Sequence, residues 1–379
     1  MLHKYKIVIH DNFSSDLKKK WDDFRQVSFN TPFQSFSLLA LWYNTIATKY
    51  YNISPCVVLI YYDGSLLAIF PLCIIKYTFR INVLEWLGGH QADYMAPLIS
   101  NVWHDNAHDI NIIWEEVINK LPDFDVIHLQ KQPEYINDVY NPMIEIMENV
   151  KYTSSYSTTL ESDWEYYKKN RIKKRILSDS HRQIRRLSEI GEIKFEVITD
   201  EIKKNNLIDN MITQKRRRYR ETSKWDMFSL DGYREFYHKC LQLKDDQIEI
   251  HCSALLVNGT MIATHFGLVN KGTFYYLMPS YEGNEWTKYS SGRILLIRLL
   301  EWSINNKLSS FDFTIGGENY KSYWCNKELS MFEQLENKTY LGMFYLFITR
   351  LKHSINKNKK IKNMINKFRN IISDAEFKS

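Results

Sequence analysis

Cysteine is scarce in this chain, and long apolar runs are missing. The five cysteines are odd in number, scattered and without a CxxC pair: Cys56, Cys73, Cys240, Cys252 and Cys325. This pattern supports neither a disulfide framework nor a zinc site, so we expect no metal. No apolar run of about 18 residues occurs, and the segment from Met1 to Lys6 has no apolar signal core. We therefore expect a soluble, cytoplasmic protein.

Hydrophobic and aromatic residues, by contrast, are plentiful. The chain has 379 residues, of which 44% are hydrophobic, which is enough for two domains with cores of their own. Its 25 Tyr and 10 Trp offer more ring surface than a core requires, which suits a cleft for polar, ring-shaped substrates. Ordinary packing of aromatic side chains in a large α/β chain is the alternative.

Positive charge is concentrated in two places although the net charge is only +6. Nine Lys/Arg lie between Lys168 and Arg186 with the single acid Asp179, and eight lie between Arg350 and Arg369 with none. Such clusters indicate either an anionic partner or a solvated face.

The hydrophobic pattern predicts the same order of elements twice: strand, two helices, three meandering strands, helix, strand, helix, strand. We therefore predict an α/β (α+β) protein of two tandem domains, each a mixed, mostly antiparallel sheet flanked by helices. The expected divisions are residues 1–160, 161–340 and a helical tail, 341–379.

Several local expectations follow from turn and cap residues. Asp63-Gly64, Asn258-Gly259 and Asn270-Lys271-Gly272 predict tight hairpins. Asp11 or Ser14 can cap the first helix. We also predict a helix near 104–120, one basic helix over 162–190, a helix over 290–306 and a last strand pair at 329–340.

The start of the helix over 290–306 is the first candidate site. Ser290, Ser291 and Gly292 are small residues that leave backbone N–H groups free to face an anion, and the helix dipole adds to the attraction. A pyrophosphate fits such a place. A serine N-cap with a glycine in the first turn is the alternative.

A series of short motifs then makes the sequence recognisable. In order along the chain they are Thr31-Pro32-Phe33-Gln34-Ser35, Asp63-Gly64 with Phe70-Pro71-Leu72, Leu87-Gly88-Gly89 with Asp93-Tyr94, Ile262-Ala263-x-His265-x-Gly267, Tyr289-Ser290-Ser291-Gly292, and Phe311-Asp312-Phe313 with Gly316-Gly317-Glu318-x-Tyr320-Lys321-x-x-Trp324. Together they resemble the CelD/BcsL-type acyltransferases of bacterial polysaccharide synthesis. These are a branch of the GNAT (Gcn5-related N-acetyltransferase) superfamily, related to the Fem aminoacyltransferases. The resemblance covers about residues 30–335.

The resemblance implies two GNAT-like domains, with the acyl donor held by the second. The donor would be acetyl-CoA or another acyl-CoA, bound at Tyr289, Ser290, Ser291, Gly292 and Arg293. This segment keeps one glycine of the superfamily loop and lacks its spacing. The Fem relatives use aminoacyl-tRNA, so a donor of that kind is the alternative.

Acyl transfer from a thioester needs a base, a donor to the developing oxyanion and an acid for the leaving thiolate. His265, on a strand beside the cofactor strand, can accept the proton of the acceptor; a buried core histidine is the alternative. Asp93 in the first domain is the other candidate base, with a turn-capping aspartate as the alternative. No Cys or Ser lies in a nucleophile setting, so direct transfer in a ternary complex is expected.

Other polar and aromatic residues are candidates for binding the acceptor: Gln91, Tyr94, Arg217, Glu318, Tyr320, Lys321 and Trp324. Arg218 competes with Arg217 for this role. For the residues after Gly316-Gly317, a capped short helix packed on the sheet is the alternative. We expect Asp312 to be a buried hydrogen-bond acceptor for that turn.

The two basic segments suggest partners. The 168–186 helix can attract the phosphates of a cofactor or nucleotide-sugar, or it can be a solvated interdomain helix. Residues from Phe344 onward read as a basic amphipathic helix suited to an anionic inner membrane surface, or to packing on the protein or a second copy.

The sequence therefore predicts an acyl-CoA-dependent N- or O-acyltransferase acting on a sugar, nucleotide-sugar or glycolipid of surface-polysaccharide synthesis. One alternative is a Fem-like transferase that uses aminoacyl-tRNA. Another is a non-catalytic scaffold docked at the membrane through its tail.

Overall fold

The computed structural model describes residues 5–77, 80–105, 109–146, 149–317 and 320–357. These residues form two compact units. The first comprises residues up to 155 together with 315–317 and 328–350, and the second comprises 156–314 and 320–327, with 351–357 assigned to it as well. The strand β10 (Asn149–Thr159) contributes residues to both units.

The first unit contains a mostly antiparallel sheet. Its strands, in spatial order, are β1 (Tyr5–His10), β3 (Asn52–Tyr62), β4 (Ser65–Lys76), β5 (Asn82–Trp86), β7 (Val126–Pro133) and β16 (Lys327–Asn337). Only the β5–β7 pair is parallel among these neighbours. The Asp63-Gly64 hairpin is confirmed, with φ of 47° and 82° at its two turn residues. The expected strand pair at 329–340 is wrong, because this segment is one strand that pairs with β7 instead of folding back on itself.

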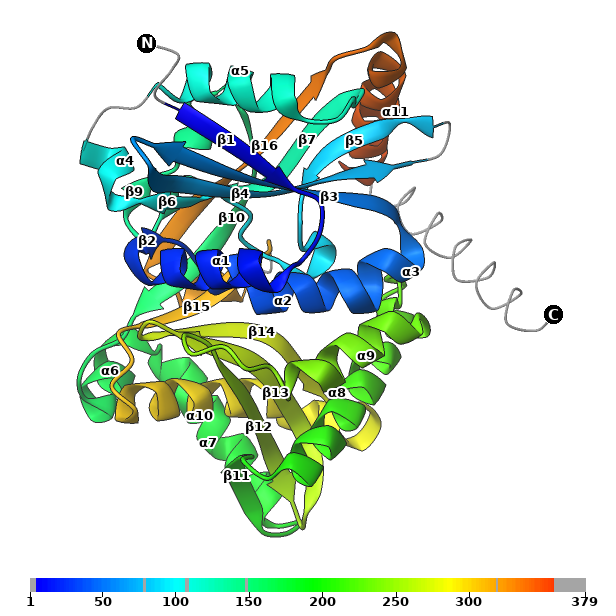
Figure 1. The fold of residues 1–379 in the computed structure, drawn as a ribbon. Helices are drawn as coiled ribbons and strands as arrows, with labels where there is room; N and C mark the ends of the chain where they lie inside the picture. The colour runs from blue at the N-terminus through cyan, green and yellow to red at the C-terminus, as the bar shows by residue number, and fades with distance from the viewer. Residues whose placement is uncertain (1–4, 78–79, 106–108, 147–148, 318–319, 358–379) are drawn as a thin grey trace, which may run out of the picture. The chain divides into compact units, whose positions relative to one another are not determined.

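Helices lie on both faces of this sheet (Figure 1). They are α1 (Ser15–Val27), α2 (Phe36–Trp42), which continues through the π-turn η3 (Tyr43–Ala47) into α3 (Thr48–Tyr50), α4 (Asn101–Asp105) and α5 (Ile110–Lys120). Ser14 caps α1 by accepting a hydrogen bond from the Leu17 N–H. The helix expected from 104 begins at Ile110, because the Asp109 carboxylate accepts from the N–H groups of Asn111 and Ile112 and fixes the start there.

The second unit repeats the antiparallel meander. Its strands are β11 (Ile193–Val197), β12 (Glu249–Val257), β13 (Thr260–Asn270), β14 (Thr273–Tyr281) and β15 (Ser310–Ile315), the last parallel to β14. Both predicted hairpins are confirmed: Asn258-Gly259 and Lys271-Gly272 have positive φ at all four residues, which the tight turn requires.

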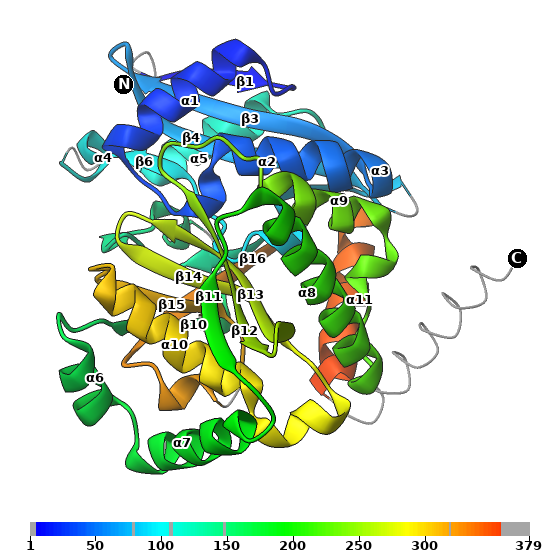
Figure 2. The same ribbon diagram turned by 90° about the horizontal axis from the view of Figure 1, so that it is seen from below.

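The helices of the second unit are α6 (Trp164–Arg171), α7 (Lys174–Ser188), α8 (Glu201–Glu221), α9 (Asp231–Cys240) and α10 (Ser291–Asn305). On β13, Thr264 bonds to Gln214 of α8, whereas its neighbour Ala263 packs in the core with Leu295 of α10. Successive strand residues point to opposite faces, so α8 and α10 cover opposite faces of the sheet (Figure 2).

The basic helix expected over 162–190 is two helices. Ile172 has an extended backbone (φ −94°, ψ 126°) and is buried in the core of the second unit. The burial of this side chain interrupts the helix, and α7 starts afresh with Lys173 at its N-cap position. Tertiary packing here overrides local helix propensity.

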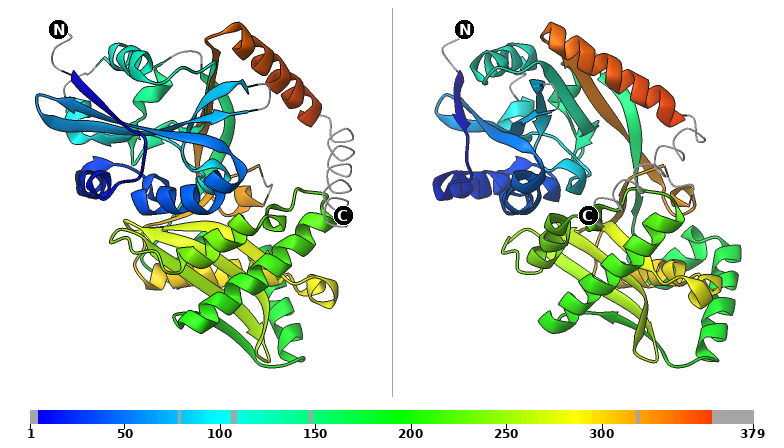
Figure 3. Two further views of the ribbon diagram at one scale, coloured as in Figure 1. Left: turned by 45° about the vertical axis from the view of Figure 1, so that its right-hand side comes forward. Right: turned by 90° about the vertical axis from the view of Figure 1, so that its right-hand side faces the viewer.

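The helix α11 (Tyr340–Lys357) follows β16 (Figure 3). Its Leu346 packs on Ile81, Val83 and Val126 of the first unit, while Tyr340, Met343, Phe344 and Phe347 are exposed. The rest of the predicted tail, residues 358–379, lies outside the described residues. None of the helices described is long and apolar enough to cross a membrane.

The remaining elements are short. They are β2 (Ser28–Phe29), β6 (Leu98–Ser100), β8 (Tyr135–Ile136), β9 (Val139–Tyr140) and the 3₁₀ turns η2 (Pro32–Gln34), η5 (Gly89–Gln91), η6 (Pro142–Ile144), η7 (Met227–Ser229), η8 (Asn284–Tyr289) and η9 (Lys321–Tyr323).

Candidate functional site

The parallel strands β14 and β15 separate partway along their length. They pair at Thr273↔Ser310, Phe274↔Phe311 and Tyr275↔Asp312. Within the part of the chain that the structure describes, β14 continues to Tyr281 without a further β15 partner. This separation leaves the later part of β14 unpaired with β15. Openings between parallel strands are common places for ligands in α/β proteins.

The loop from β14 to α10 ends in the predicted cofactor segment. Ser290 occupies the N-cap position of α10 in the left-handed region (φ 53°) and makes no side-chain cap bond. A serine cap of the usual kind, the alternative considered for this segment, is therefore not what the geometry shows. Gly292 is closely approached: a Cβ there would lie 3.1 Å from Cδ1 of Tyr281. The first N–H groups of a helix have no partner within the helix, so this loop can receive an anion.

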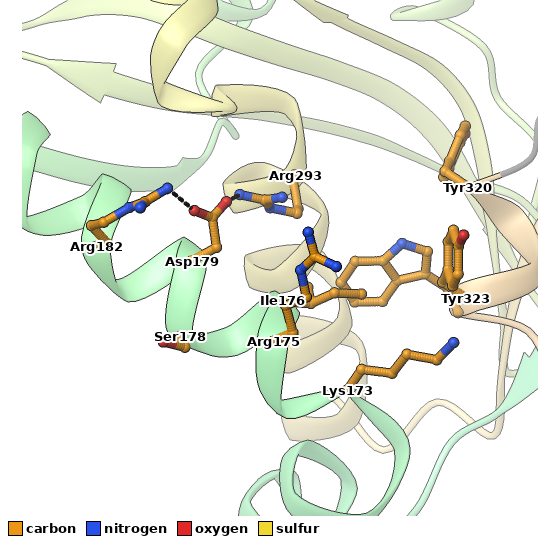
Figure 4. Close-up of a pocket in the computed structure, with 10 residues that line it drawn as sticks. Lys173, Arg175, Ile176, Ser178, Asp179, Arg182, Arg293, Tyr320 and Tyr323 are labelled. Atoms are coloured by element: carbon orange, nitrogen blue, oxygen red, sulfur yellow. Dashed lines mark hydrogen bonds and ion pairs between the residues drawn. The ribbon is translucent and has the colours of Figure 1, made fainter.

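The helix α7 lines this loop. Asp179 forms ion pairs with Arg293 in the first turn of α10 and with Arg182 on its own helix (Figure 4). One turn beyond Arg182, the guanidinium of Arg186 lies 5.3 Å from the ring centroid of Tyr289. Side chains on one side of α7 therefore contact the predicted cofactor segment, through Asp179 at Arg293 and through Arg186 at Tyr289. This part of the basic helix is not only a solvated face.

A pocket of about 870 Å³ opens between α7, the start of α10 and η9 (Figure 4). It is lined by Lys173, Arg175, Ile176, Ser178, Asp179, Arg182, Arg293, Tyr320, Tyr323 and Trp324. Four cations and one carboxylate give this lining a net positive charge, and three aromatic rings lie on the η9 side. Phosphate groups and a flat base are the chemistry that such a lining accommodates.

The pocket brings together three residues that the sequence singled out separately: Arg293, Tyr320 and Trp324. Tyr323 was missed, although it lies in the same motif. Lys173, Arg175 and Arg182 were recognised only as part of a basic helix. For Arg175 and Arg182 the signal was the combination of charge with the i, i+4, i+7 spacing of residues 175, 179 and 182, which places these three residues on one helix face.

The end of β15 is held by polar contacts to the backbone of Thr314. The Asp312 carboxylate accepts a 2.7 Å bond from the Thr314 N–H, and Lys321 Nζ donates a 3.3 Å bond to the Thr314 carbonyl. Thr314 has φ of 56°, which is unusual for a β-branched residue. Asp312 is thus an acceptor, but it is partly buried and bonds to Thr314 within β15, two residues before the predicted Gly316-Gly317 turn. Buried Lys321 fixes the same stretch of backbone. Glu318 lies outside the described residues.

Arg217 of α8 supports the far end of β14. It donates a 2.6 Å hydrogen bond to the Tyr281 carbonyl and pairs with Glu221. Tyr281 in turn is the residue that Gly292 approaches. Arg218, the competing candidate, is half-exposed and pairs with Glu221. The geometry distinguishes the two arginines, which the sequence could not.

With this geometry in place, residues 174–322 match the family model described as "Acetyltransferase (GNAT) domain". The chain is an acyltransferase. The wider GNAT resemblance is confirmed over this range, and domains of this kind generally use acyl-CoA. No curated protein sequence matches the chain significantly.

Solved structures share the fold. FemX is 9% identical, with 86% of this chain and 96% of FemX covered and a TM-score of 0.59. The C-terminal domain (DUF2156) of a candidate lysylphosphatidylglycerol synthetase from Agrobacterium fabrum is 10% identical, with 89% and 96% covered and a TM-score of 0.51. A tandem GNAT protein from the clavulanic acid biosynthesis pathway is 9% identical, with 88% and 98% covered and a TM-score of 0.48. The sheets described above, together with the likeness in fold to FemX, confirm the predicted fold class.

His265, a predicted base of the GNAT domain, is fully buried on β13. Its ring stacks on Tyr276 at 4.7 Å and on Phe274 at 5.3 Å, and no partner occurs for either ring nitrogen among the described residues. Burial, with a contribution from His251, holds the pKa of His265 well below its ordinary value. The imidazole is therefore neutral, as a base must be, but no water or acceptor reaches it in this arrangement.

The other predicted base and its neighbours belong to the first unit. Asp93 is partly exposed at the end of the Gly88–Tyr94 loop, whereas the Tyr94 side chain is buried on Phe33 with ring centroids 5.6 Å apart. Lys131 Nζ holds the loop by donating to the carbonyls of Gly89 (3.0 Å) and Ala92 (2.7 Å). Gln91 is partly exposed in the same loop. The roles of these residues stay predictions.

Three of the cysteines have thiol groups that are unsuited to act as nucleophiles. Burial raises the pKa of the Cys252 and Cys325 thiols to about 12 and that of Cys56 to about 11. A thiol with so high a pKa stays protonated near neutral pH and is a poor nucleophile.

Proposed function

We propose that this protein transfers an acyl group, acetyl in the first instance, from coenzyme A to an amine or hydroxyl of a sugar, nucleotide-sugar or glycolipid in bacterial surface-polysaccharide synthesis. The observation that carries the proposal is the pocket at the start of α10, where Arg293 and the α7 cations meet Tyr320, Tyr323 and Trp324. When bound, acyl-CoA would supply the activated acyl group.

The residues present fit such a donor. The Ser291 and Gly292 N–H groups and Arg293 would hold the pyrophosphate, since they combine a helix N-terminus with a guanidinium. The aromatic rings near η9 would stack on the base. The part of β14 beyond Tyr275, which is not paired with β15, would offer backbone N–H groups to polarise the thioester carbonyl.

Two residues stay candidates for removing the proton from the acceptor. Asp93 is supported by its partial exposure. The ammonium group of Lys131, which is held on the same loop, interacts electrostatically with Asp93 and would favour the carboxylate form of Asp93. His265 is supported by its strand beside β14. Its lowered pKa keeps it neutral but makes it a weak base, and it would need an opening of the core to act. In this proposal the second unit holds the donor and the first unit holds the acceptor.

The donor is tested by calorimetric titration of acetyl-CoA into the full chain and into a Gly292→Glu variant. We expect the native chain to bind in the roughly 1 μM to 1 mM range usual for enzyme substrates. The variant should lose at least about 10-fold in affinity, because its side chain meets Tyr281 and places a carboxylate at the anion position.

Asn305→Glu is the matched control for Gly292→Glu, because it adds the same carboxylate at the exposed opposite end of α10. It should bind acetyl-CoA as the native chain does. Absence of binding by the native chain would overturn the donor assignment. Mass-spectrometric screening of acyl-CoAs against nucleotide-sugars would then identify the acceptor.

A Fem-like transferase using aminoacyl-tRNA is the second candidate, favoured by the likeness in fold to FemX and by the basic face of α7. In that reading α7 would bind the acceptor stem. Binding of charged tRNA that weakens steeply with salt, together with no binding of acetyl-CoA, would favour it.

Peripheral contact with an anionic membrane is a further part of the proposal. Its support is the exposed apolar side of α11 (Tyr340, Met343, Phe344 and Phe347) together with the basic sequence that follows. Sedimentation with anionic vesicles should require residues 344–379, and binding without them would contradict this role.

A further inference from the structure

The cations of the pocket fall into two groups. Arg182 and Arg293 share the Asp179 carboxylate. Lys173 and Arg175 line the same pocket, and no ion pair to either occurs among the residues that the structure describes. Two positive charges at the N-terminal end of α7 can therefore bind an anionic group of a ligand in the pocket.

The fold explains why these two side chains face the pocket. Ile172 is buried in the core and ends α6, so the chain restarts as α7 with Lys173 at the N-cap position. Arg175 lies on the same face of α7 as Asp179, one turn later, and Arg182, two turns later (Figure 4). Ser180 and Leu187 are buried on a different face of the helix. The interruption of the basic helix thus presents its first cations to the pocket.

The immediate surroundings suit a phosphorylated nucleoside. Lys173 Nζ lies 4.4 Å from the ring centroid of Tyr323, and Trp324 lines the pocket beside it. A base stacked on these rings would bring a phosphate on its ribose close to Lys173 and Arg175. An arginine fork and an ammonium together match the charge and the oxygens of a phosphate monoester dianion.

We propose that Lys173 and Arg175 form a phosphate-monoester subsite that selects a donor carrying a 3′-phosphate on its ribose. This inference rests on the proposed function and names the part of coenzyme A that α7 recognises. Arg293 and the start of α10 then serve the pyrophosphate, and Lys173 with Arg175 serves the second phosphate. Dephospho-coenzyme A, which lacks the 3′-phosphate, is the weaker ligand.

The test compares calorimetric titrations of coenzyme A and dephospho-coenzyme A into the full chain and its variants. We expect the native chain to bind coenzyme A roughly 10- to 100-fold more tightly, the range for losing a charge-assisted hydrogen bond. Arg175→Ala should weaken coenzyme A binding and leave dephospho-coenzyme A binding unchanged, so that the ratio falls toward one. Arg175→Lys keeps the charge without the fork and should lie between.

Arg185→Ala is the matched control, because Arg185 is exposed on the same helix and does not line the pocket. It should preserve the native ratio. Equal affinity of the native chain for the two nucleotides, or an unchanged ratio in Arg175→Ala, would overturn the subsite while leaving the donor assignment intact. Failure of the native chain to bind either nucleotide would overturn both.

Discussion

Both units contain a parallel strand pair at the same point of their element order, and the two pairs lead to different surroundings. In the second unit, β14 and β15 pair over three residues and a basic, aromatic pocket lies nearby at the start of α10. In the first unit, β5 and β7 pair at Val83↔Val126 and Leu84↔Ile127, and the next residues, Glu85 and His128, enter a network of partly or fully buried side chains.

That network is dense. His128 Nε2 lies 2.6 Å from Glu333 of β16, and its Nδ1 lies 3.1 Å from the hydroxyl of Tyr345 on α11. Glu85 accepts a 2.8 Å bond from the Tyr77 hydroxyl, and burial raises the pKa of Glu85. The same order of elements therefore has two different surroundings. In the first unit the polar side chains form hydrogen bonds with one another, and in the second unit they line a pocket.

Removing a carboxylate from each place should have the largest and most unequal effect on stability. Glu333→Leu leaves buried His128 and partly buried Gln130 without this acceptor, so we expect a loss of about 2–5 kcal/mol in unfolding free energy. Asp179→Leu in the second unit removes an acceptor from partly exposed arginines and should cost less than about 1 kcal/mol.

Urea unfolding of both variants measures this difference through the midpoint and slope of the transition. Glu333→Gln, which keeps the shape and a hydrogen-bonding oxygen, should recover part of the loss. Equal small losses in the two leucine variants would break the comparison, because they would make the first-unit network as dispensable as a surface ion pair.

The buried histidines of the two units differ in their hydrogen bonding, which should make the stability of the second unit depend on pH. Unlike His128, His251 and His265 have no hydrogen-bond partner among the described residues. Burial lowers the pKa of His251 to about 3 and that of His265 well below its usual range. The unfolded chain therefore binds more protons, so their contribution to stability is present above about pH 6.5 and is lost as the pH falls toward 3.

In that window each histidine should lower the free energy of unfolding by up to about 1.4 kcal/mol for each unit by which the pH falls. Unfolding measured between pH 7.5 and 5 should show a smaller pH slope in His265→Phe than in the native chain. His181→Gln, at an exposed position of α7, is the control and should keep the native slope. An unchanged slope in His265→Phe would mean that its ring titrates normally.

Much of the fold was predictable from local chemistry. Asp63-Gly64 and Asn258-Gly259 turn because their backbones accept positive φ, and Ser14 starts a helix because its hydroxyl accepts a free N–H. Where distant packing decides, the sequence was insufficient. The pairing of β16 with β7 depends on partners some 200 residues apart, and the break at Ile172 depends on a core pocket for that side chain.

The candidate site was predictable in parts and not as a whole. The start of α10 was recognisable from its small residues, and Tyr320 and Trp324 from their motif. The pairing of Arg293 with Asp179 joins residues 114 positions apart, and nothing local to either predicts it. For the same reason the sequence could not assign Lys173 and Arg175 to a pocket, or show that His265 is enclosed by aromatic rings.

The most direct test of the central claim, that the second unit holds the donor and the first does not, is hydrogen exchange of the full chain with and without acetyl-CoA. We expect acetyl-CoA to slow exchange at 276–281, at 289–293 and along the first turns of α7. Exchange at 83–87 and 126–130 should stay unchanged. Protection confined to the β5 and β7 segments, with none at the start of α10, would contradict the account.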